Sequence, residues 1–151
     1  MSMENRLLLG RCCRFLCIYD HESGLRALRS MASTDSAPDA DRPALVLLSP
    51  EGAGVYMGAV WWHALVQGLA AAVTGQESGS FQVDGNEADG LPFVHVLDCG
   101  GSAVHAVMAL RHGQRAVVLD AQDAQAMAAR TLFRQAGGVV LASRPAIISP
   151  Y

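Results

Sequence analysis

Short, continuous apolar runs separated by helix-length segments are the feature that most limits the fold of this chain. There are four of them: ALVLLS (44–49), FVHVLD (93–98), RAVVLD (115–120) and VVLAS (139–143). A strand with one face in water alternates apolar and polar residues, whereas a continuous apolar strand is typical of a parallel sheet covered by helices. Each segment between two runs is long enough for a helix, so the runs are expected to pair in parallel through right-handed crossovers.

The segments between the runs also carry helix signals. The predicted helices cover residues 55–73, 102–113 and 124–138. Ser102 is a predicted N-cap, Gly113 a predicted helix end, and Asp123 lies near the start of the last helix. We therefore predict an α/β fold, with a small, mostly parallel sheet of four to five strands and helices packed on it in a Rossmann-like or flavodoxin-like three-layer arrangement. The fifth strand would come from residues 14–19.

The chain has 151 residues, the length of a single domain. Residues 1–30 carry five Arg and three acidic residues, and we expect them to form an N-terminal arm or to precede a true translation start at Met31. Residues 31–43 are rich in Ser, Asp, Ala and Pro, which predicts a linker. Residues 44–151 are then a single α/β domain, in which 75–90 is a polar, glycine-rich loop.

Composition excludes several classes of function. All eleven basic residues are Arg, so Schiff-base and P-loop chemistry, which need Lys, are excluded. This Arg usage, together with abundant Ala, Gly and Val, indicates a GC-rich bacterial genome. The net charge is −3 and no basic stripe is present, so we expect no nucleic-acid partner.

The cysteines and the N-terminal segment indicate where the protein works. Four cysteines at 12, 13, 17 and 99 match neither a spaced disulfide framework nor a C-x-x-C zinc site, so we predict free thiols in a reducing cytoplasm and no metal site. Arg11 and Arg14 interrupt the N-terminal apolar stretch, which argues against a signal peptide. His63 and Gln67 within 55–73 favour a helix packed on the sheet over a membrane span.

Three segments are expected to meet at the carboxyl ends of the strands, where parallel α/β sheets bind ligands. These segments are 49–58, 98–102 and 120–123. Gly52 and Gly54 belong to a G-x-G-x-x-x-G pattern that resembles a dinucleotide-binding turn. The acidic residue of such a site lies about 20 residues further on, whereas Asp98 is 44 residues past Gly54. The alternative is a tight turn with Gly58 allowing close helix–sheet packing.

The loop DCGGS (98–102) has two interpretations. Gly100, Gly101 and Ser102 could hold a phosphate or carboxylate at a helix N-terminus. The same helix dipole would lower the pKa of Cys99 and make it a nucleophile. The plainer interpretation, which we favour, is a strand-to-helix turn with an inert thiol, placed where this fold would put a site.

Two aspartates and two tryptophans complete the candidates. Asp98 and Asp120 each end a V-L-D strand, so they could act as acid and base or hold a metal, although capping of the following helices is favoured. Trp61 and Trp62 are adjacent on one helix, and neighbours there point about 100° apart. One of the two should therefore face away from the core and mark a partner surface.

Two functional hypotheses follow, and no cofactor is identified. The first is a non-catalytic binding or regulatory module that holds a small anionic, phosphate- or nucleotide-like ligand, or that docks on a protein partner or a second copy through the Trp61–Trp62 helix. The ligand-binding residues would be Gly52, Gly54, Asp98, Cys99, Gly100, Gly101, Ser102 and Asp120. The second hypothesis is a small enzyme that uses Cys99 as nucleophile, or Asp98 and Asp120 as acid and base or metal ligands.

Overall fold

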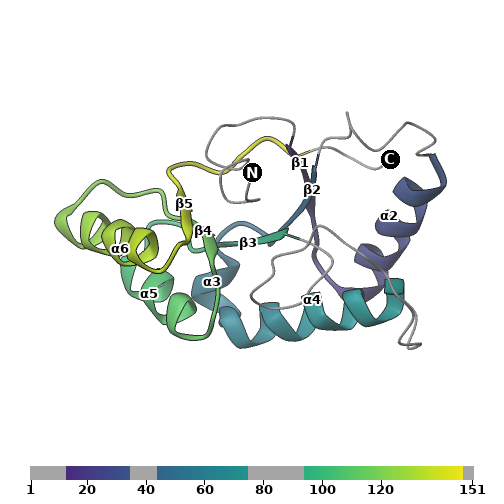
Figure 1. Ribbon diagram of the computed structural model, residues 1–151, viewed down its shortest axis with the longest axis horizontal. Coiled ribbons are helices and arrows are strands. Elements are labelled where there is room, and N and C mark those ends of the chain that lie inside the picture. Colours follow the sequence, from purple (N-terminus) through teal and green to yellow (C-terminus); the bar gives the residue numbers. More distant parts are fainter. Residues whose placement is uncertain (1–12, 35–43, 75–93, 148–151) are drawn as a thin grey trace.

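The computed structural model describes residues 13–34, 44–74 and 94–147, and these form one five-stranded parallel sheet with helices packed on it (Figure 1). The strands are β1 (Cys13–Cys17), β2 (Ala44–Leu48), β3 (Val94–Asp98), β4 (Ala116–Val118) and β5 (Val139–Leu141). All four strand pairs are parallel, in the order β1-β2-β3-β4-β5. The predicted α/β class, with a mostly parallel sheet of four to five strands, is confirmed, including the fifth strand, which the region 14–19 supplies as β1.

The described helices form one continuous layer against this sheet. They are α2 (His21–Thr34), α3 (Ala53–Tyr56), α4 (Gly58–Thr74), α5 (Ala103–Arg111) and α6 (Ala124–Gln135). Parallel crossovers are right-handed, so a sheet whose strand order never reverses receives its crossover helices on the same face. Figure 1 shows the five helices on that one side, where α2 packs beside α4 and α5 beside α6.

The predicted helix ends are confirmed at both α5 and α6. The side chain of Ser102 caps α5 and accepts a hydrogen bond from the His105 N–H. Asp123 caps α6, and its Oδ1 accepts from the Ala126 N–H at 2.8 Å. Gly113 has a φ of 92° where the chain leaves α5, a left-handed conformation that glycine adopts without steric cost.

The predicted single helix over 55–73 is wrong in one respect, because the segment is broken. A four-residue helix, α3, ends at Tyr56, and the 17-residue α4 begins at Gly58. Gly58, the first residue of α4, has a φ of 87°, which does not occur in the interior of a right-handed helix, so α3 and α4 cannot form one continuous helix.

Helix α2 was not predicted from the sequence. Asp20 precedes this helix, and its Oδ1 accepts a hydrogen bond from the Ser23 N–H at 2.7 Å, which also lowers the pKa of Asp20. Ala27 and Leu28 are buried in the core of the helix layer. Because α2 runs to Thr34, it continues through Met31, and the segment expected to be a linker begins within a helix.

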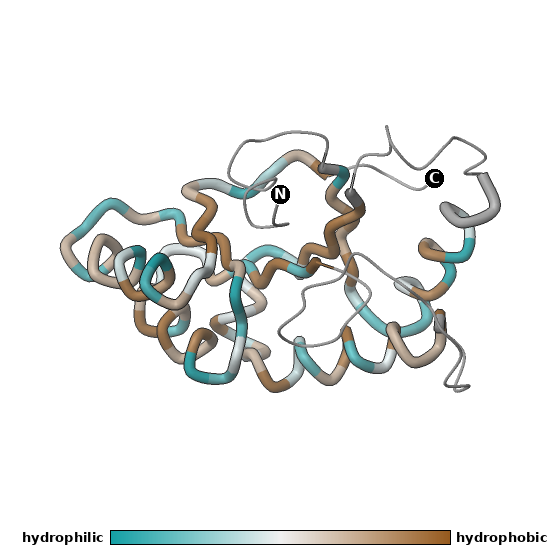
Figure 2. The backbone as a smooth tube through the Cα atoms, viewed as in Figure 1, coloured by the Kyte–Doolittle hydropathy of each residue, from teal (hydrophilic) through white to brown (hydrophobic). Residues whose placement is uncertain are grey.

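The two faces of the sheet have different cores. On the helix side, strand residues such as Leu16, Leu47 and Leu97 pack with Trp62 of α4 and Phe133 of α6. The other face is lined by side chains from the strands alone, and within the described ranges no helix packs there. These residues are Val46, Leu48, Val94, Val96, Ala116, Val118 and Val139, with Phe15 and Leu141 packed against them. Figure 2 shows the hydrophobic colour following the strands.

The chain beyond β5 returns across the molecule to the opposite edge of the sheet. Figure 1 shows this segment in yellow, leading from β5 towards β1. Ile147 makes an isolated parallel bridge with Phe15 of β1. Arg144 lies midway along this return and is therefore brought over the carboxyl ends of the strands.

Some predictions concern parts of the chain outside the described residues. The polar loop expected at 75–90, residues 1–12 of the expected N-terminal arm and the thiol of Cys12 all lie there, whereas residues 13–30 contain β1 and the first part of α2. Within the described part of the chain, no helix has both the length and the apolar character needed to cross a membrane.

Candidate functional site

The carboxyl ends of the strands bring together the three segments that the sequence placed there. The Asp98 N–H donates to Ser49 Oγ at 2.8 Å, which joins the end of β3 to the end of β2. The Asp120 N–H donates to the Gly100 carbonyl at 2.7 Å, which joins the end of β4 to the DCGGS loop. This edge, which we call the strand-tip edge, is thus a connected set of turns.

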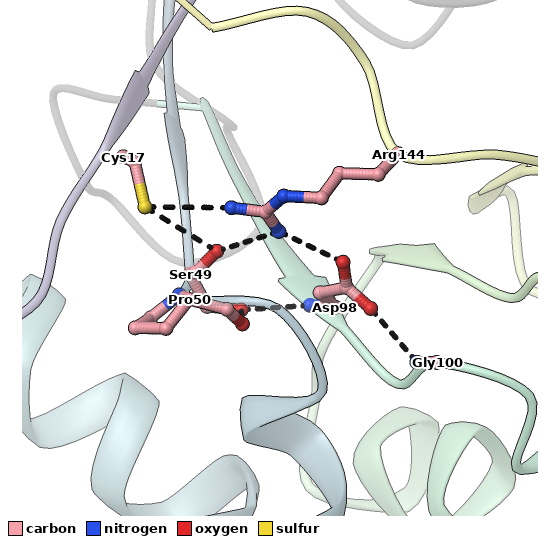
Figure 3. Close-up of polar contacts among 6 residues, drawn as sticks. All are labelled: Cys17, Ser49, Pro50, Asp98, Gly100 and Arg144. Carbon is pink, nitrogen blue, oxygen red and sulfur yellow. Dashed lines mark hydrogen bonds and ion pairs between the residues drawn. The ribbon is translucent and has the colours of Figure 1, made fainter.

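An ion pair that was not predicted from the sequence lies at the centre of the strand-tip edge (Figure 3). Arg144 Nη1 donates to Asp98 Oδ2 at 2.8 Å and to the Ser49 carbonyl at 3.0 Å. The side chain of Asp98 is 2% exposed and that of Arg144 is 24% exposed. A carboxylate buried to this degree needs a partner charge, and Arg144 supplies it.

The same guanidinium reaches the end of β1. Arg144 Nη2 lies 3.4 Å from Cys17 Sγ, and the Cys17 thiol lies 3.8 Å from the Ser49 carbonyl, to which it can donate. Burial disfavours the charged form of Arg144, but its hydrogen bond to Asp98 and the nearby negative groups raise its pKa above the ordinary value. A hydrogen bond with Cys17 raises the pKa of the exposed Tyr19 hydroxyl. Arg144 therefore ties β1, β2 and β3 together.

Asp98 and Asp120 do not cap the helices that follow them, so that favoured interpretation is wrong. Asp98 Oδ1 accepts from the Gly100 N–H, two residues on, at 2.8 Å, which is an Asx turn rather than a helix cap. The α5 and α6 caps are Ser102 and Asp123. Asp120 is exposed, whereas Asp98 is buried and paired, so the two carboxylates lie in unlike environments.

Cys99 has the opposite properties to those of an activated nucleophile. Its side chain is fully buried in the helix-side core. Burial, with a contribution from the charge of Asp98, raises the pKa of the Cys99 thiol to about 12. The expectation that the helix dipole lowers this pKa is wrong, because loss of hydration outweighs the dipole when a thiol is surrounded by apolar atoms.

The glycine turn before α3 serves packing. A Cβ added at Gly54 would lie 2.7 Å from Cys99 Sγ and 3.1 Å from the Asp98 carbonyl, so Gly54 allows α3 to approach β3 closely. Gly52 has a φ of 73° and forms the turn itself. Gly58 was the glycine expected to allow close helix–sheet packing. A Cβ added at Gly58 would have no atom within 4 Å, so Gly58 does not serve that purpose. The four-residue α3 has a small dipole, and the sheet lacks the strand-order reversal at which dinucleotides bind.

Three histidines, His63, His95 and His105, make hydrogen bonds with other side chains of the fold. Trp62 Nε1 donates to His95 Nδ1 at 3.1 Å inside the core, which places the proton of a neutral His95 ring on Nε2. His63 Nε2 lies 2.8 Å from Gln114 Oε1, an acceptor, so it acts as the donor. At the start of α5, His105 Nδ1 lies 2.6 Å from the capping hydroxyl of Ser102.

The tryptophan pair is less exposed than expected. Trp62 is fully buried and Trp61 is half-buried against the helix-side core. Several large apolar side chains that do face outwards lie instead on α3, α4 and α5, among them Tyr56, Val60 and Met108, and others lie on α6, such as Met127 and Leu132.

Two members of the strand-tip edge, Cys17 and Arg144, were not predicted from the sequence, and Ser49 was predicted only as part of the segment 49–58 and not as a site residue. Ser49 and Arg144 follow β2 and β5, so the rule that selected Asp98 and Asp120 could also have selected them. Cys17 is the last residue of β1, so the same rule about strand ends could have selected it. The sequence could not indicate that Arg144 pairs with Asp98, because 46 positions separate them.

Comparison with known proteins finds no match to any family model, curated protein or solved structure. Among the residues that the structure describes, no group of three or more His, Cys, Asp or Glu side chains could hold a metal ion. The candidate site therefore has to be judged on its own geometry.

Proposed function

We propose that this protein is a non-catalytic protein-binding module that docks through the outer surface of its helix layer. The observation that carries the proposal is a set of exposed large apolar side chains on three neighbouring helices, α3, α4 and α5, and on the turn between α3 and α4, which we call the helix-layer patch. Its members are Val55, Tyr56, Met57, Val60, Val104 and Met108.

The exposure of these side chains is high for their type. Val60 is 66% exposed and Met108 is 50% exposed. Single exposed apolar residues are common on any protein, whereas a group of them gathered on adjoining elements is typical of a binding surface. The three helices are in mutual contact, since α3 packs beside both α4 and α5, and α4 also packs beside α5.

Three of the groups with catalytic potential support a non-catalytic role because the fold already uses their side chains. Asp98 is neutralised by Arg144, and Cys99 is buried with a raised pKa. The hydroxyl of Ser102 caps α5. A catalytic group has to reach a substrate, and each of these three side chains instead contacts the protein itself.

A small anionic ligand at the DCGGS loop is the second candidate. It is favoured by the exposed Gly101, where an added Cβ would lie 3.5 Å from the Asp120 carbonyl and meet nothing closer. Saturable stabilisation by inorganic phosphate in a thermal-shift assay, abolished in Gly101→Val, is the expected result for such a site. It ranks second because the Arg144 guanidinium is already paired.

The docking proposal is tested by size-exclusion chromatography of fresh extracts from cells that naturally express the protein. Wild type is expected to elute above its monomer mass of 15.9 kDa. Met57→Glu and Met108→Glu should elute as monomers, whereas Gln135→Glu, an equal change of charge at an exposed position of α6, should elute as wild type. Elution of wild type as a monomer, or no effect of the patch variants, would overturn the proposal.

A further inference from the structure

The helix-layer patch is bordered by two opposite charges, Glu51 and Arg111. Glu51 is exposed on the turn before α3, and Arg111 is exposed in the last turn of α5. Neither side chain forms a salt bridge with any residue that the structure describes. Charges at the rim of an interface fix the register of the partner and exclude wrong partners. These two residues therefore indicate which charges the partner of the patch has to present.

The two charges lie at opposite ends of α5. A Cβ added at Gly54 of α3 would lie 2.7 Å from Cys99 Sγ, and Cys99 shortly precedes α5. This contact places α3, and Glu51 just before it, beside the start of α5. Arg111 is the last of the nine residues of α5, so the helix separates the two charges by about 13 Å along its axis.

An exposed apolar stripe of α5 connects these two ends. Val104 and Met108 are exposed, and together with Arg111 they are spaced by four and three positions, which aligns all three on one face of the helix. The stripe begins beside the exposed Gly101, where an added Cβ would meet only the Asp120 carbonyl, at 3.5 Å. The outer face of α5 thus has an acidic end, an apolar middle and a basic end.

The described part of the chain has the same polarity as α5. Arg115 Nη1 donates to a carbonyl at the end of α6, and Arg134 is in the last turn of α6, so both lie at the basic end. The Arg residues nearest the acidic end are bonded to groups of their own chain, namely Arg26, Arg130 and Arg144. Every described acidic residue lies between the last residue of a strand and the first turn of the next helix: Asp20, Glu22, Glu51, Asp98, Asp120 and Asp123.

We infer that the partner of the helix-layer patch is a second copy of the chain, with the two α5 helices antiparallel about a two-fold axis perpendicular to them. The axis passes midway between Val104 and Met108, so Val104 of each copy faces Met108 of the other. Arg111 lies as far beyond the axis as Gly101 lies before it. The guanidinium of each copy therefore reaches the open space at Gly101 of the other copy, beside Glu51 of that copy.

The order of the charges favours a second copy over an unrelated partner. A complementary partner needs an apolar surface with a basic residue opposite Glu51 and an acidic residue opposite Arg111. This chain presents that arrangement itself, in the reversed order that a perpendicular two-fold axis requires. A parallel pair would place Arg111 against Arg111 and Glu51 against Glu51, and like charges across an interface are unfavourable. The inference rests on the proposed docking function, and it names the partner.

Sedimentation equilibrium of purified full-length chains with exchanged charges tests this arrangement. Wild type is expected to form a dimer increasingly as its concentration rises. Arg111→Glu and Glu51→Arg each place like charges together at both charged contacts, so each chain alone should dimerise about tenfold more weakly than wild type. In an equal mixture of the two variants, every charged contact between unlike chains again joins an acidic residue to an Arg. The mixture should therefore dimerise about as strongly as wild type.

Arg29→Glu is the matched control, because it makes the same change of charge at an exposed position of α2, at the opposite end of the helix layer from α5 (Figure 1). It should dimerise as wild type does. A wild-type chain that stays monomeric at high concentration would overturn the inference, and so would a mixture that dimerises no better than its two components. The docking proposal would remain if extracts still showed a larger complex that Met108→Glu disrupts.

Discussion

The strand-tip edge and the helix-layer patch are opposite kinds of surface. At the strand-tip edge, polar groups from four separate segments bond to one another, so that Asp98, Arg144, Ser49 and Cys17 form a closed set. On the helix-layer patch, large apolar side chains such as Val60 and Met108 are exposed to solvent. The first region has its partners within the chain, and the second has apolar surface still available for burial.

This difference shows that position in a fold does not by itself identify a binding site. The carboxyl ends of parallel strands are where α/β proteins usually bind ligands. Here the strand order runs from one edge of the sheet to the other, and the return of the chain after β5 brings Arg144 across those ends. This difference is why we propose a structural role for the strand-tip edge and a binding role for the helix layer.

The largest expected effect follows from breaking the ion pair. Arg144→Met leaves the buried Asp98 carboxylate without a cation, so we expect a loss of about 3 kcal/mol in the free energy of unfolding. Asp98→Asn keeps an oxygen for the Gly100 N–H, and the double variant should recover about 2 kcal/mol of that loss. Urea denaturation of the wild type, the two single variants and the double variant measures the coupling energy between Arg144 and Asp98. Additive effects would show that the strand-tip edge does not depend on this pair.

Gly54 tests whether the glycine turn serves packing or a ligand. Gly54→Ala should cost about 2 kcal/mol, because its Cβ would overlap Cys99 Sγ. Gly101→Ala is the matched control, because its Cβ would make only an ordinary contact, 3.5 Å from the Asp120 carbonyl, and it should change stability by less than about 0.5 kcal/mol. Both values come from the same denaturation experiment. A neutral Gly54→Ala would mean that α3 is not held closely against β3.

The buried Cys99 thiol predicts a specific dependence on pH. Its folded pKa of about 12 lies above the ordinary value of 9.0, so the unfolded chain loses this proton at lower pH than the folded one. The thiol's contribution to stability is complete below pH 9 and is lost as the pH rises towards 12, about 1 kcal/mol of it by pH 10. The free energy of unfolding of Cys99→Ala, measured against pH, should decline less steeply over this range than that of wild type. Identical profiles for the two proteins would place the thiol in water.

The smallest effect on stability is expected at the helix-layer patch. Met108→Gln replaces an exposed apolar side chain that makes no core contribution, so the free energy of unfolding should change by less than about 0.5 kcal/mol. Thermal denaturation at low protein concentration measures this without interference from association. A loss above about 1 kcal/mol would show that Met108 belongs to the core rather than to a free surface.

Local sequence signals predicted much of the fold. The continuous apolar runs identified β2 to β5, and the caps Ser102 and Asp123 identified where α5 and α6 begin, because these features depend on neighbouring residues. The helix α2 was missed because its many exposed polar residues make the segment as polar as an arm.

The candidate site was less predictable for a physical reason. The convergence of the strand ends followed from the parallel sheet, but the chemistry of the site depends on contacts between distant positions. Arg144 meets Cys17 across 127 positions, and the burial of Cys99 depends on how closely Gly54 allows α3 to approach. Neither contact leaves a local signal, so the environments of Asp98 and Cys99 could not be derived from the chain alone.

Site-specific photo-cross-linking in living cells compares the two surfaces most directly. A benzoylphenylalanine replaces Met108 on the helix-layer patch in one chain and the exposed Asp120 on the strand-tip edge in another. We predict a discrete cross-linked protein adduct from position 108 and none from position 120. An adduct formed only from position 120 would contradict this assignment and would give the binding role to the strand-tip edge.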